Sequence, residues 1–219
     1  MKHDPVFNEI ARWGVVPVIA IESVEAALPL ADALLEGGLG VVEITFRTAI
    51  AAEVIACMVQ ARPELLVGAG TVLTEANVKA AKAAGAQFAV APGLNPVTIC
   101  AAQEVGLPFA PGVCTPSEIE MALSLECGVA KYFPSEPWGG VEMLRAIAAP
   151  YAHTGIRFMP TGGINAANLE SYLYFKAVTA VGGTWIARPE DLSAGKWQVI
   201  RDRCKTAMEI VRKVRGPTA

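Results

Sequence analysis

The 219-residue sequence has little histidine, no closely spaced cysteines and almost no excess charge. Its two histidines, His3 and His153, are too few to supply a histidine-ligated metal site. The five cysteines show no C-x-x-C spacing, which argues against a zinc site and a disulfide framework. Eighteen Lys and Arg against 21 Asp and Glu give a net charge of −3, unlike the basic surface of a nucleic-acid-binding protein. We therefore expect no metal, no other cofactor and no nucleic-acid partner.

Long apolar runs are also missing, although hydrophobic residues make up 53% of the chain. No segment approaches the roughly 18 uninterrupted apolar residues of a membrane-spanning helix. The first ten residues include Asp4 and Glu9 and lack the apolar core of a secretory signal, so we expect a cytoplasmic protein without a membrane partner. The apolar residues form short runs separated by Gly, Pro or charge, which is typical of buried parallel strands covered by helices.

One pattern repeats along the chain: a short apolar run, an Ala-rich segment with helical periodicity, a glycine, and the next apolar run. The predicted strands cover residues 15–21, 41–46, 65–71, 88–92, 108–113, 130–134, 157–161 and 178–182. The predicted helices cover residues 24–36, 49–61, 75–84, 96–105, 116–126, 141–148, 166–173 and 197–215. An extra N-terminal helix is expected within residues 1–13, capping the floor of the fold.

Eight strands alternating with eight helices predict an α/β fold of the (β/α)8 TIM-barrel type. No linker rich in Pro or Ser interrupts the series, so residues 1–219 are expected to form one domain. A doubly wound open sheet is the alternative, because the same alternation builds it. The first predicted strand is not followed by the Gly-x-Gly-x-x-Gly turn of a dinucleotide-binding fold, which favours the barrel.

Capping signals mark several of the predicted boundaries. Thr74 precedes Glu75 at one helix start, and Thr115-Pro116-Ser117-Glu118 has the spacing of a capping box at another. Glycines follow four of the predicted helices, where a left-handed residue commonly ends a helix. They are Gly37–Gly38, Gly85, Gly106 and Gly128.

The catalytic residues of a barrel lie at the carboxyl ends of its strands, and two predicted strands carry charge there. Glu43, Thr45 and Arg47 have the same parity in one strand and should face the same side. Lys131 lies within the apolar run Gly-Val-Ala-Lys-Tyr-Phe-Pro. Burial disfavours the charged amine, and a neutral lysine amine can attack a carbonyl to form a Schiff base. The structural alternative is a lysine that only bridges to Glu43.

Glycine pairs at the last two predicted strand ends form a second candidate site. The sequences are Thr161-Gly162-Gly163 and Gly182-Gly183-Thr184. Loops after strands seven and eight of a barrel commonly bind phosphate through backbone N–H groups, and glycine allows close approach of the anion. These turns predict an anion site, with ordinary turn chemistry as the alternative.

Eight segments taken together resemble the class I 2-keto-3-deoxy-6-phosphogluconate (KDPG) and 4-hydroxy-2-oxoglutarate (KHG) aldolase family. The resemblance covers about residues 13–212. The segments are Val-Pro-Val-Ile (16–19), Val-Glu-Ile-Thr-Phe-Arg-Thr (42–48), Val-Gly-Ala-Gly-Thr-Val-Leu (67–73), Ala-Pro-Gly-Leu (91–94), Pro-Gly-Val-Cys-Thr-Pro-Ser-Glu (111–118), Lys-Tyr-Phe-Pro-Ser-Glu (131–136), Pro-Thr-Gly-Gly-Ile (160–164) and Val-Gly-Gly-Thr-Trp (181–185).

The resemblance implies a metal-independent (β/α)8 barrel that usually forms a homotrimer. It implies that Lys131 is the Schiff-base lysine and Glu43 the general acid/base. The remaining implied substrate-binding residues fall into three groups. They are Arg47, Thr71 and Thr161 at the pyruvyl carboxylate, Pro92 and Phe133 at the pocket walls, and Gly162, Gly163, Gly183 and Thr184 at the phosphate. This chain has Thr184 where the family often has Ser, and Ser135 where it often has Ala.

The expected reaction is reversible cleavage of KDPG to pyruvate and glyceraldehyde 3-phosphate, with KHG cleavage to pyruvate and glyoxylate as a related activity. Two other functions stay open from the residues. A sugar-phosphate isomerase or epimerase would use the glycine turns without Lys131, and a non-enzymatic scaffold would use neither.

Overall fold

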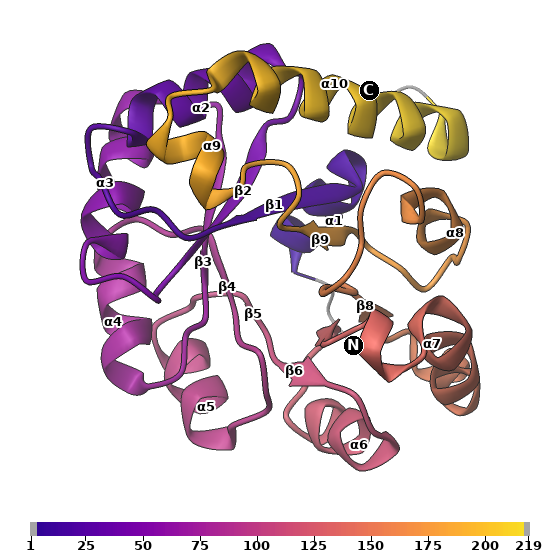
Figure 1. The fold of residues 1–219 in the computed structure, drawn as a ribbon. Helices are drawn as coiled ribbons and strands as arrows, with labels where there is room; N and C mark the ends of the chain where they lie inside the picture. Colours follow the sequence, from indigo (N-terminus) through magenta and orange to yellow (C-terminus); the bar gives the residue numbers. More distant parts are fainter. Residues whose placement is uncertain (1–3, 217–219) are drawn as a thin grey trace.

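The computed structural model describes residues 4–216 and consists of parallel strands surrounded by helices (Figure 1). The strands are β1 (Val15–Ile19), β2 (Val41–Thr45), β3 (Leu66–Gly70), β4 (Phe88–Val90), β5 (Phe109–Ala110), β6 (Gly112–Val113), β7 (Val129–Tyr132), β8 (Arg157–Phe158) and β9 (Val181–Gly183). Six of them form one sheet in the order β5-β4-β3-β2-β1-β9, and three form a second in the order β6-β7-β8. All the strand pairs are parallel, so their carboxyl ends meet on one side.

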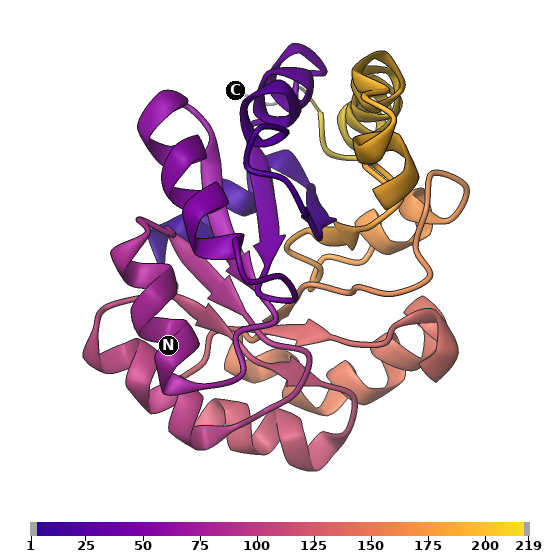
Figure 2. The same cartoon turned by 60° about the vertical axis from the view of Figure 1, so that its left-hand side comes forward.

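The helices lie outside the curled strands, as Figure 2 shows from a second direction. They are α1 (Pro5–Trp13), α2 (Ala27–Glu36), α3 (Ala51–Ala61), α4 (Glu75–Ala83), α5 (Pro96–Glu104), α6 (Pro116–Ser124), α7 (Gly140–Ala148), α8 (Leu169–Leu173), α9 (Pro189–Ser193) and α10 (Trp197–Arg215). Two 3-10 helices, η1 (Glu136–Trp138) and η2 (Ala149–Thr154), flank α7. Within residues 4–216, no helix is both long enough and apolar enough to cross a bilayer.

Strands β1 to β4, β7 and β8 begin within one residue of their predicted starts, and each is shorter than predicted. The predicted strand at 108–113 is divided into β5 and β6 at Pro111, which has no N–H for a ladder hydrogen bond. Strand β8 ends at Phe158, two residues before Pro160. The predicted strand at 178–182 was placed too early, because β9 covers Val181–Gly183 and Val178 forms an isolated bridge to Phe158.

The predicted capping contacts are present at two helices, but one of the glycines predicted to end a helix does not do so. The Thr74 hydroxyl accepts from the N–H of Asn77 at the start of α4, and Thr115 and Glu118 form the capping box of α6. After α6, the left-handed residue is Glu126, with a φ of 58°, rather than Gly128. Helices η1 and α9 were not predicted, because each is a single short turn.

Helix α1 precedes β1 and packs on the amino-terminal side of the strands. Its Phe7 and Ile10 side chains are buried, and the Phe7 ring lies 6.4 Å from the ring of Phe88, the first residue of β4. Residues 1–3 of the segment expected to hold this helix lie outside the described residues. The carboxyl ends of the strands are thereby left as the face where polar side chains can gather.

Candidate active site

Glu43 and Lys131 form a buried ion pair between two strands that are distant in sequence. Glu43 is the third residue of β2 and Lys131 the third residue of β7. Lys131 Nζ lies 3.1 Å from Glu43 Oε1 and 3.3 Å from Oε2. The Lys131 side chain is 7% exposed and the Glu43 side chain 1%. Both predicted catalytic residues are thus together in a water-poor interior, where their attraction is stronger than at the surface.

The position of Glu43 depends on a glycine that the sequence analysis did not single out. Strand β3 pairs with β2 so that Gly68 lies beside Glu43 and Gly70 beside Thr45. A Cβ atom on Gly70 would overlap the Glu43 carboxylate. The Gly-Ala-Gly pattern at the end of β3 was the available signal, because glycine in a strand often marks a close approach by another group.

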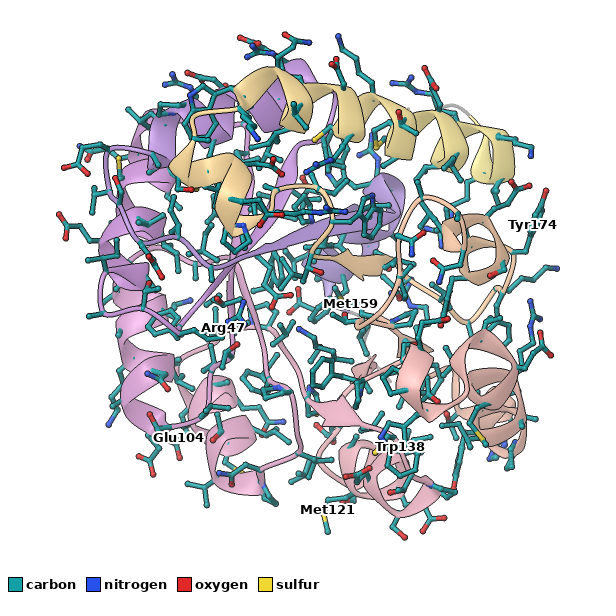
Figure 3. All side chains as sticks on the ribbon, in the orientation of Figure 1. Arg47, Glu104, Met121, Trp138, Met159 and Tyr174 are labelled. Atoms are coloured by element: carbon teal, nitrogen blue, oxygen red, sulfur yellow. The ribbon has the colours of Figure 1, made fainter. Side chains whose placement is uncertain are left out.

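Arg47 lies two residues beyond the end of β2. Its Nε donates a 3.2 Å hydrogen bond to Thr45 Oγ1, which orients the guanidinium along the strand. Thr45 and Glu43 are buried, whereas Arg47 is exposed. The shared parity therefore brings Glu43 and Thr45 to the interior, and Arg47 follows beyond the strand, where Figure 3 shows it within the ring of helices.

The other residues predicted around the pyruvyl group also lie at strand ends. Thr71 follows β3 with a φ of 55°, an unusual conformation for a β-branched residue that is concentrated at functional sites. Phe133 follows β7, with its ring centroid 5.9 Å from Lys131 Nζ. Pro92 comes two residues after the end of β4 and is half-buried.

The two glycine turns are adjacent and are held by backbone contacts. Gly162 and Gly163 have φ values of 105° and 80°, which favour glycine. An isolated bridge pairs Thr161 with Gly182, and a Cβ atom on Gly182 would overlap the Thr161 hydroxyl. Gly183 is buried, whereas Thr184 is exposed. The predicted anion-site residues are therefore brought to one place.

A polar network that the sequence did not reveal supports the Gly162 turn. The N–H of Ser135 donates to the Thr161 carbonyl at 2.8 Å, and the N–H of Glu136 donates to the Gly162 carbonyl at 3.0 Å. The Tyr172 hydroxyl hydrogen-bonds to Ser135 Oγ at 2.8 Å and donates to the Glu136 carboxylate. Burial, together with that carboxylate, raises the pKa of the Tyr172 hydroxyl, so it stays a hydrogen-bond donor at neutral pH.

This arrangement offers an amine, a carboxylate within hydrogen-bonding distance of it, and a separate turn rich in backbone N–H groups. Such a set can carry out nucleophilic attack on a carbonyl with proton transfer by the carboxylate. Across the described part of the chain, no cluster of three His, Cys, Asp or Glu side chains could hold a metal ion.

Comparison with known proteins identifies the family. A model of the KDPG and KHG aldolase family matches residues 6–203. The chain is 43% identical to 2-dehydro-3-deoxy-phosphogluconate aldolase of Treponema pallidum, over 94% of this chain and 97% of that one. It is 42% identical to KHG/KDPG aldolase of Escherichia coli, over 89% and 91% of the two chains.

A solved structure extends this similarity to the fold. It is KDPG aldolase of Legionella pneumophila with pyruvate captured as a covalent carbinolamine intermediate. The TM-score is 0.87 and the identity 38%, with 92% of this chain and 97% of the other covered. The chain therefore belongs to the KDPG and KHG aldolase family.

Proposed function

We propose that the protein is a class I aldolase that reversibly cleaves KDPG to pyruvate and glyceraldehyde 3-phosphate. The observation that carries this proposal is the buried contact of 3.1 Å between Lys131 Nζ and Glu43 Oε1 at the carboxyl ends of the strands. A buried lysine and carboxylate within proton-transfer distance are the two groups that Schiff-base chemistry needs. Cleavage of KHG to pyruvate and glyoxylate is a second reaction of the same site.

Lys131 is the nucleophile in this mechanism. Transfer of its proton to Glu43 leaves a neutral amine, which attacks the C2 ketone to form a carbinolamine. Glu43 returns this proton to the departing hydroxyl, so loss of water gives a protonated imine and leaves Glu43 as a carboxylate. The protonated imine then accepts the electron pair of the breaking C3–C4 bond. Hydrolysis of the final imine releases pyruvate and regenerates the Lys131 amine.

Glu43 moves the protons of the carbon–carbon cleavage. As a carboxylate it takes the proton of the C4 hydroxyl, directly or through a water, while the aldehyde product forms. The resulting enamine is then protonated at C3 by the same carboxyl group. One residue can serve both steps because the two steps require opposite protonation states of Glu43.

The remaining predicted residues bind the two ends of the substrate. Arg47, Thr71 and Thr161 bind the pyruvyl carboxylate, since they lie at strand ends around the ion pair. The half-buried Pro92 and Phe133 form pocket walls. The phosphate is bound by the glycine turns. Their residues are Gly162, Gly163, Gly183 and Thr184.

Release of pyruvate during incubation with KDPG tests this function. We expect wild-type protein to release pyruvate from KDPG with a higher kcat/KM than from KHG, and Lys131→Met to release none. Lys82→Met is the matched control, because Lys82 is an exposed helical lysine. Conversion of a sugar phosphate by Lys131→Met at the wild-type rate would instead indicate an isomerase or epimerase.

We further propose that the strands close into a (β/α)8 barrel within one domain. Strands β5 and β6 are separated by the single residue Pro111 and count as one barrel strand. The remaining gap is bridged by the N–H of Gly182, which donates to the Pro160 carbonyl at 2.8 Å, and by the Phe158–Val178 bridge. Helix α1 covers the floor of this barrel.

A cytoplasmic homotrimer is proposed as the working form. Leu73 and Val97 are exposed apolar side chains at one edge of the barrel mouth, where the Thr98 hydroxyl donates to the Leu73 carbonyl. Burial of such side chains between subunits would remove apolar surface from water. Light scattering of the purified protein tests this proposal by giving the mass of a trimer or of a monomer.

A further inference from the structure

A cavity of about 430 Å³ lies on the amino-terminal side of the strands, at the end opposite the Lys131–Glu43 pair. Arg157, the first residue of β8, and Arg215, the last residue of α10, both line it. Thr161 comes four residues after Arg157, so about 13 Å of extended chain divides this cavity from the predicted anion turn. Tyr174, another lining residue, lies at the rim of the ring of helices, away from Arg47 (Figure 3).

Neither arginine has an acidic partner among the described residues, since neither guanidinium forms a salt bridge with a carboxylate there. Arg157 Nη2 donates to Asn8 Oδ1 at 2.8 Å, and Arg215 donates to the carbonyls of Ala11, Val178 and Thr179. A guanidinium has five N–H donors, so both retain hydrogen-bonding capacity while their charges are left uncompensated.

The local environment disfavours two charges of the same sign. Burial lowers the pKa of Arg157, and burial together with the charge of Arg157 lowers the pKa of Arg215. Lys176 adds a third cation to the lining. A bound anion would relieve the repulsion among these groups and could accept bidentate hydrogen bonds from a guanidinium.

Two buried polar atoms on lining residues also have no hydrogen-bond partner within residues 4–216. They are Arg157 Nε and the hydroxyl oxygen of Thr179, whose residue is 1% exposed. An unpaired buried polar group is costly, and such groups in native structures often indicate an absent ion or water. The lining thus combines cations with apolar walls from Leu173 and Val214, and the two unpaired atoms are enclosed within residues that line the cavity.

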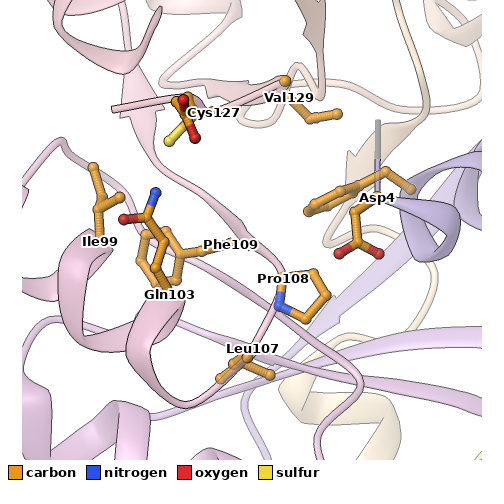
Figure 4. Close-up of a pocket in the computed structure, with 12 residues that line it drawn as sticks. Asp4, Ile99, Gln103, Leu107, Pro108, Phe109, Cys127 and Val129 are labelled. Carbon is orange, nitrogen blue, oxygen red and sulfur yellow. The ribbon is translucent and has the colours of Figure 1, made fainter. Parts of the chain in front are cut away.

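A neighbouring cavity on the same side provides a contrast. It has a volume of about 300 Å³ and lies between α1, the start of β5 and the start of β7 (Figure 4). Asp4 and Glu126 line it, and its described lining includes no lysine or arginine. Its charge would repel an anion, so the cationic lining is specific to the cavity at Arg157 and Arg215.

We propose that the cavity lined by Arg157, Arg215, Lys176 and Thr179 is a second binding site, separate from the catalytic site, for the phosphate group of a small phosphorylated molecule. The guanidiniums and Lys176 bind the phosphate oxygens. Leu173 and Val214 contact the carbon skeleton, for which the cavity has room beyond one phosphate group.

Tungstate, a tetrahedral dianion with strong anomalous scattering, locates the site directly. Crystals of the full chain soaked in tungstate should show an anomalous peak between Arg157 and Arg215, whether or not a second peak lies at the Gly162–Gly163 turn. A peak at the turn alone, or at neither place, would overturn the proposal.

Calorimetric titration with inorganic phosphate tests the same site in solution. Arg157→Gln should weaken one class of phosphate binding by about tenfold or more while kcat/KM for aldol cleavage stays unchanged. Lys176→Gln, which changes an exposed side chain, should weaken it by about two- to fivefold and keeps the test decisive if Arg157→Gln does not fold. Arg12→Gln is the control, because Arg12 is an exposed arginine of α1 outside the cavity lining. Equal phosphate affinity in all four proteins would contradict the proposal.

Discussion

Two ion pairs in this protein, one buried and one with a half-buried arginine, differ in what surrounds them. Lys131 and Glu43 connect β7 to β2, and within the described chain the Glu43 carboxylate has no hydrogen bond other than those to Lys131. Asp191 and Arg203 connect α9 to α10, and Arg203 also donates to the Ile186 carbonyl. The first pair keeps hydrogen-bonding capacity for a substrate, whereas the second joins structural elements. Breaking the Lys131–Glu43 pair should therefore mainly reduce activity, and breaking the Asp191–Arg203 pair should mainly reduce stability.

The largest effect is expected from Glu43→Gln, which keeps the shape of the side chain and removes its proton transfer. Aldol cleavage should fall by about 10²–10⁴-fold. The melting temperature should fall as well, because the buried Lys131 loses its counter-charge, but the amide oxygen still accepts its hydrogen bond and limits that fall. Steady-state kinetics and a thermal melt measure the two properties on one sample. Turnover near that of wild type would show that Glu43 is not the essential acid/base.

Gly70→Ala should disturb the same pair without changing either of its members. The added Cβ would overlap the Glu43 carboxylate and displace it from Lys131. A displacement of about 1 Å can cost roughly 100-fold in rate, so we expect a loss of that size in kcat. Ala69→Gly, at the neighbouring buried position, is the control for altered strand packing. Equal kcat values for Gly70→Ala and Ala69→Gly would show that Gly70 has no special role in placing Glu43.

Thr184→Val tests the far end of the site, because it removes a hydroxyl at nearly constant volume. A hydrogen bond to a charged group is worth about 1.5–3 kcal/mol, which corresponds to about 10–150-fold in kcat/KM. The loss should fall on KDPG, which carries the phosphate, more than on KHG. An equal loss for both substrates would leave phosphate binding to the glycine backbone alone.

Asp191→Asn should give the converse result, with stability lost and activity kept at temperatures well below the melting point. Burial opposes ionisation of Asp191, but the hydrogen bond and charge of Arg203 prevail and lower its pKa. The pair should therefore stabilise the fold above the unfolded pKa of about 3.9 and stop doing so as the pH falls through the lower folded pKa. We expect a loss of about 1–3 kcal/mol at pH 7 in urea unfolding, and a smaller difference from wild type near pH 3. A difference that grows on acidification would contradict this assignment.

The sequence predicted the two charged strand residues better than it predicted the boundaries of β5, β6 and β8. Glu43 and Lys131 were found because each interrupts an apolar strand with a charge, and a charge in such a place requires a partner. Strands β5, β6 and β8 were less predictable because Pro111 and Pro160 interrupt the hydrogen-bond ladder without interrupting the apolar pattern. Their residues nevertheless lie where the pattern placed them.

Apart from the Lys131–Glu43 contact, the contacts between distant segments could not be read from the sequence. The overlap that a Gly70 Cβ would make depends on the β2–β3 register, and the Tyr172 bonds to Ser135 and Glu136 depend on how α8 packs beside the turn after β7. The proximity of Arg157 and Arg215 likewise joins the start of β8 to the end of α10. Local periodicity carries no information about such pairs, because it describes faces of elements and not their neighbours.

Covalent trapping of pyruvate tests the central role of Lys131 most directly. Wild-type protein, Lys131→Met and the control Lys82→Met are incubated with pyruvate and borohydride, which reduces an imine to a stable amine, and their intact masses are measured. We expect one pyruvate adduct on wild type and on Lys82→Met, with peptide mapping to Lys131, and none on Lys131→Met. An adduct of equal yield on Lys131→Met, or no adduct on wild type, would contradict it.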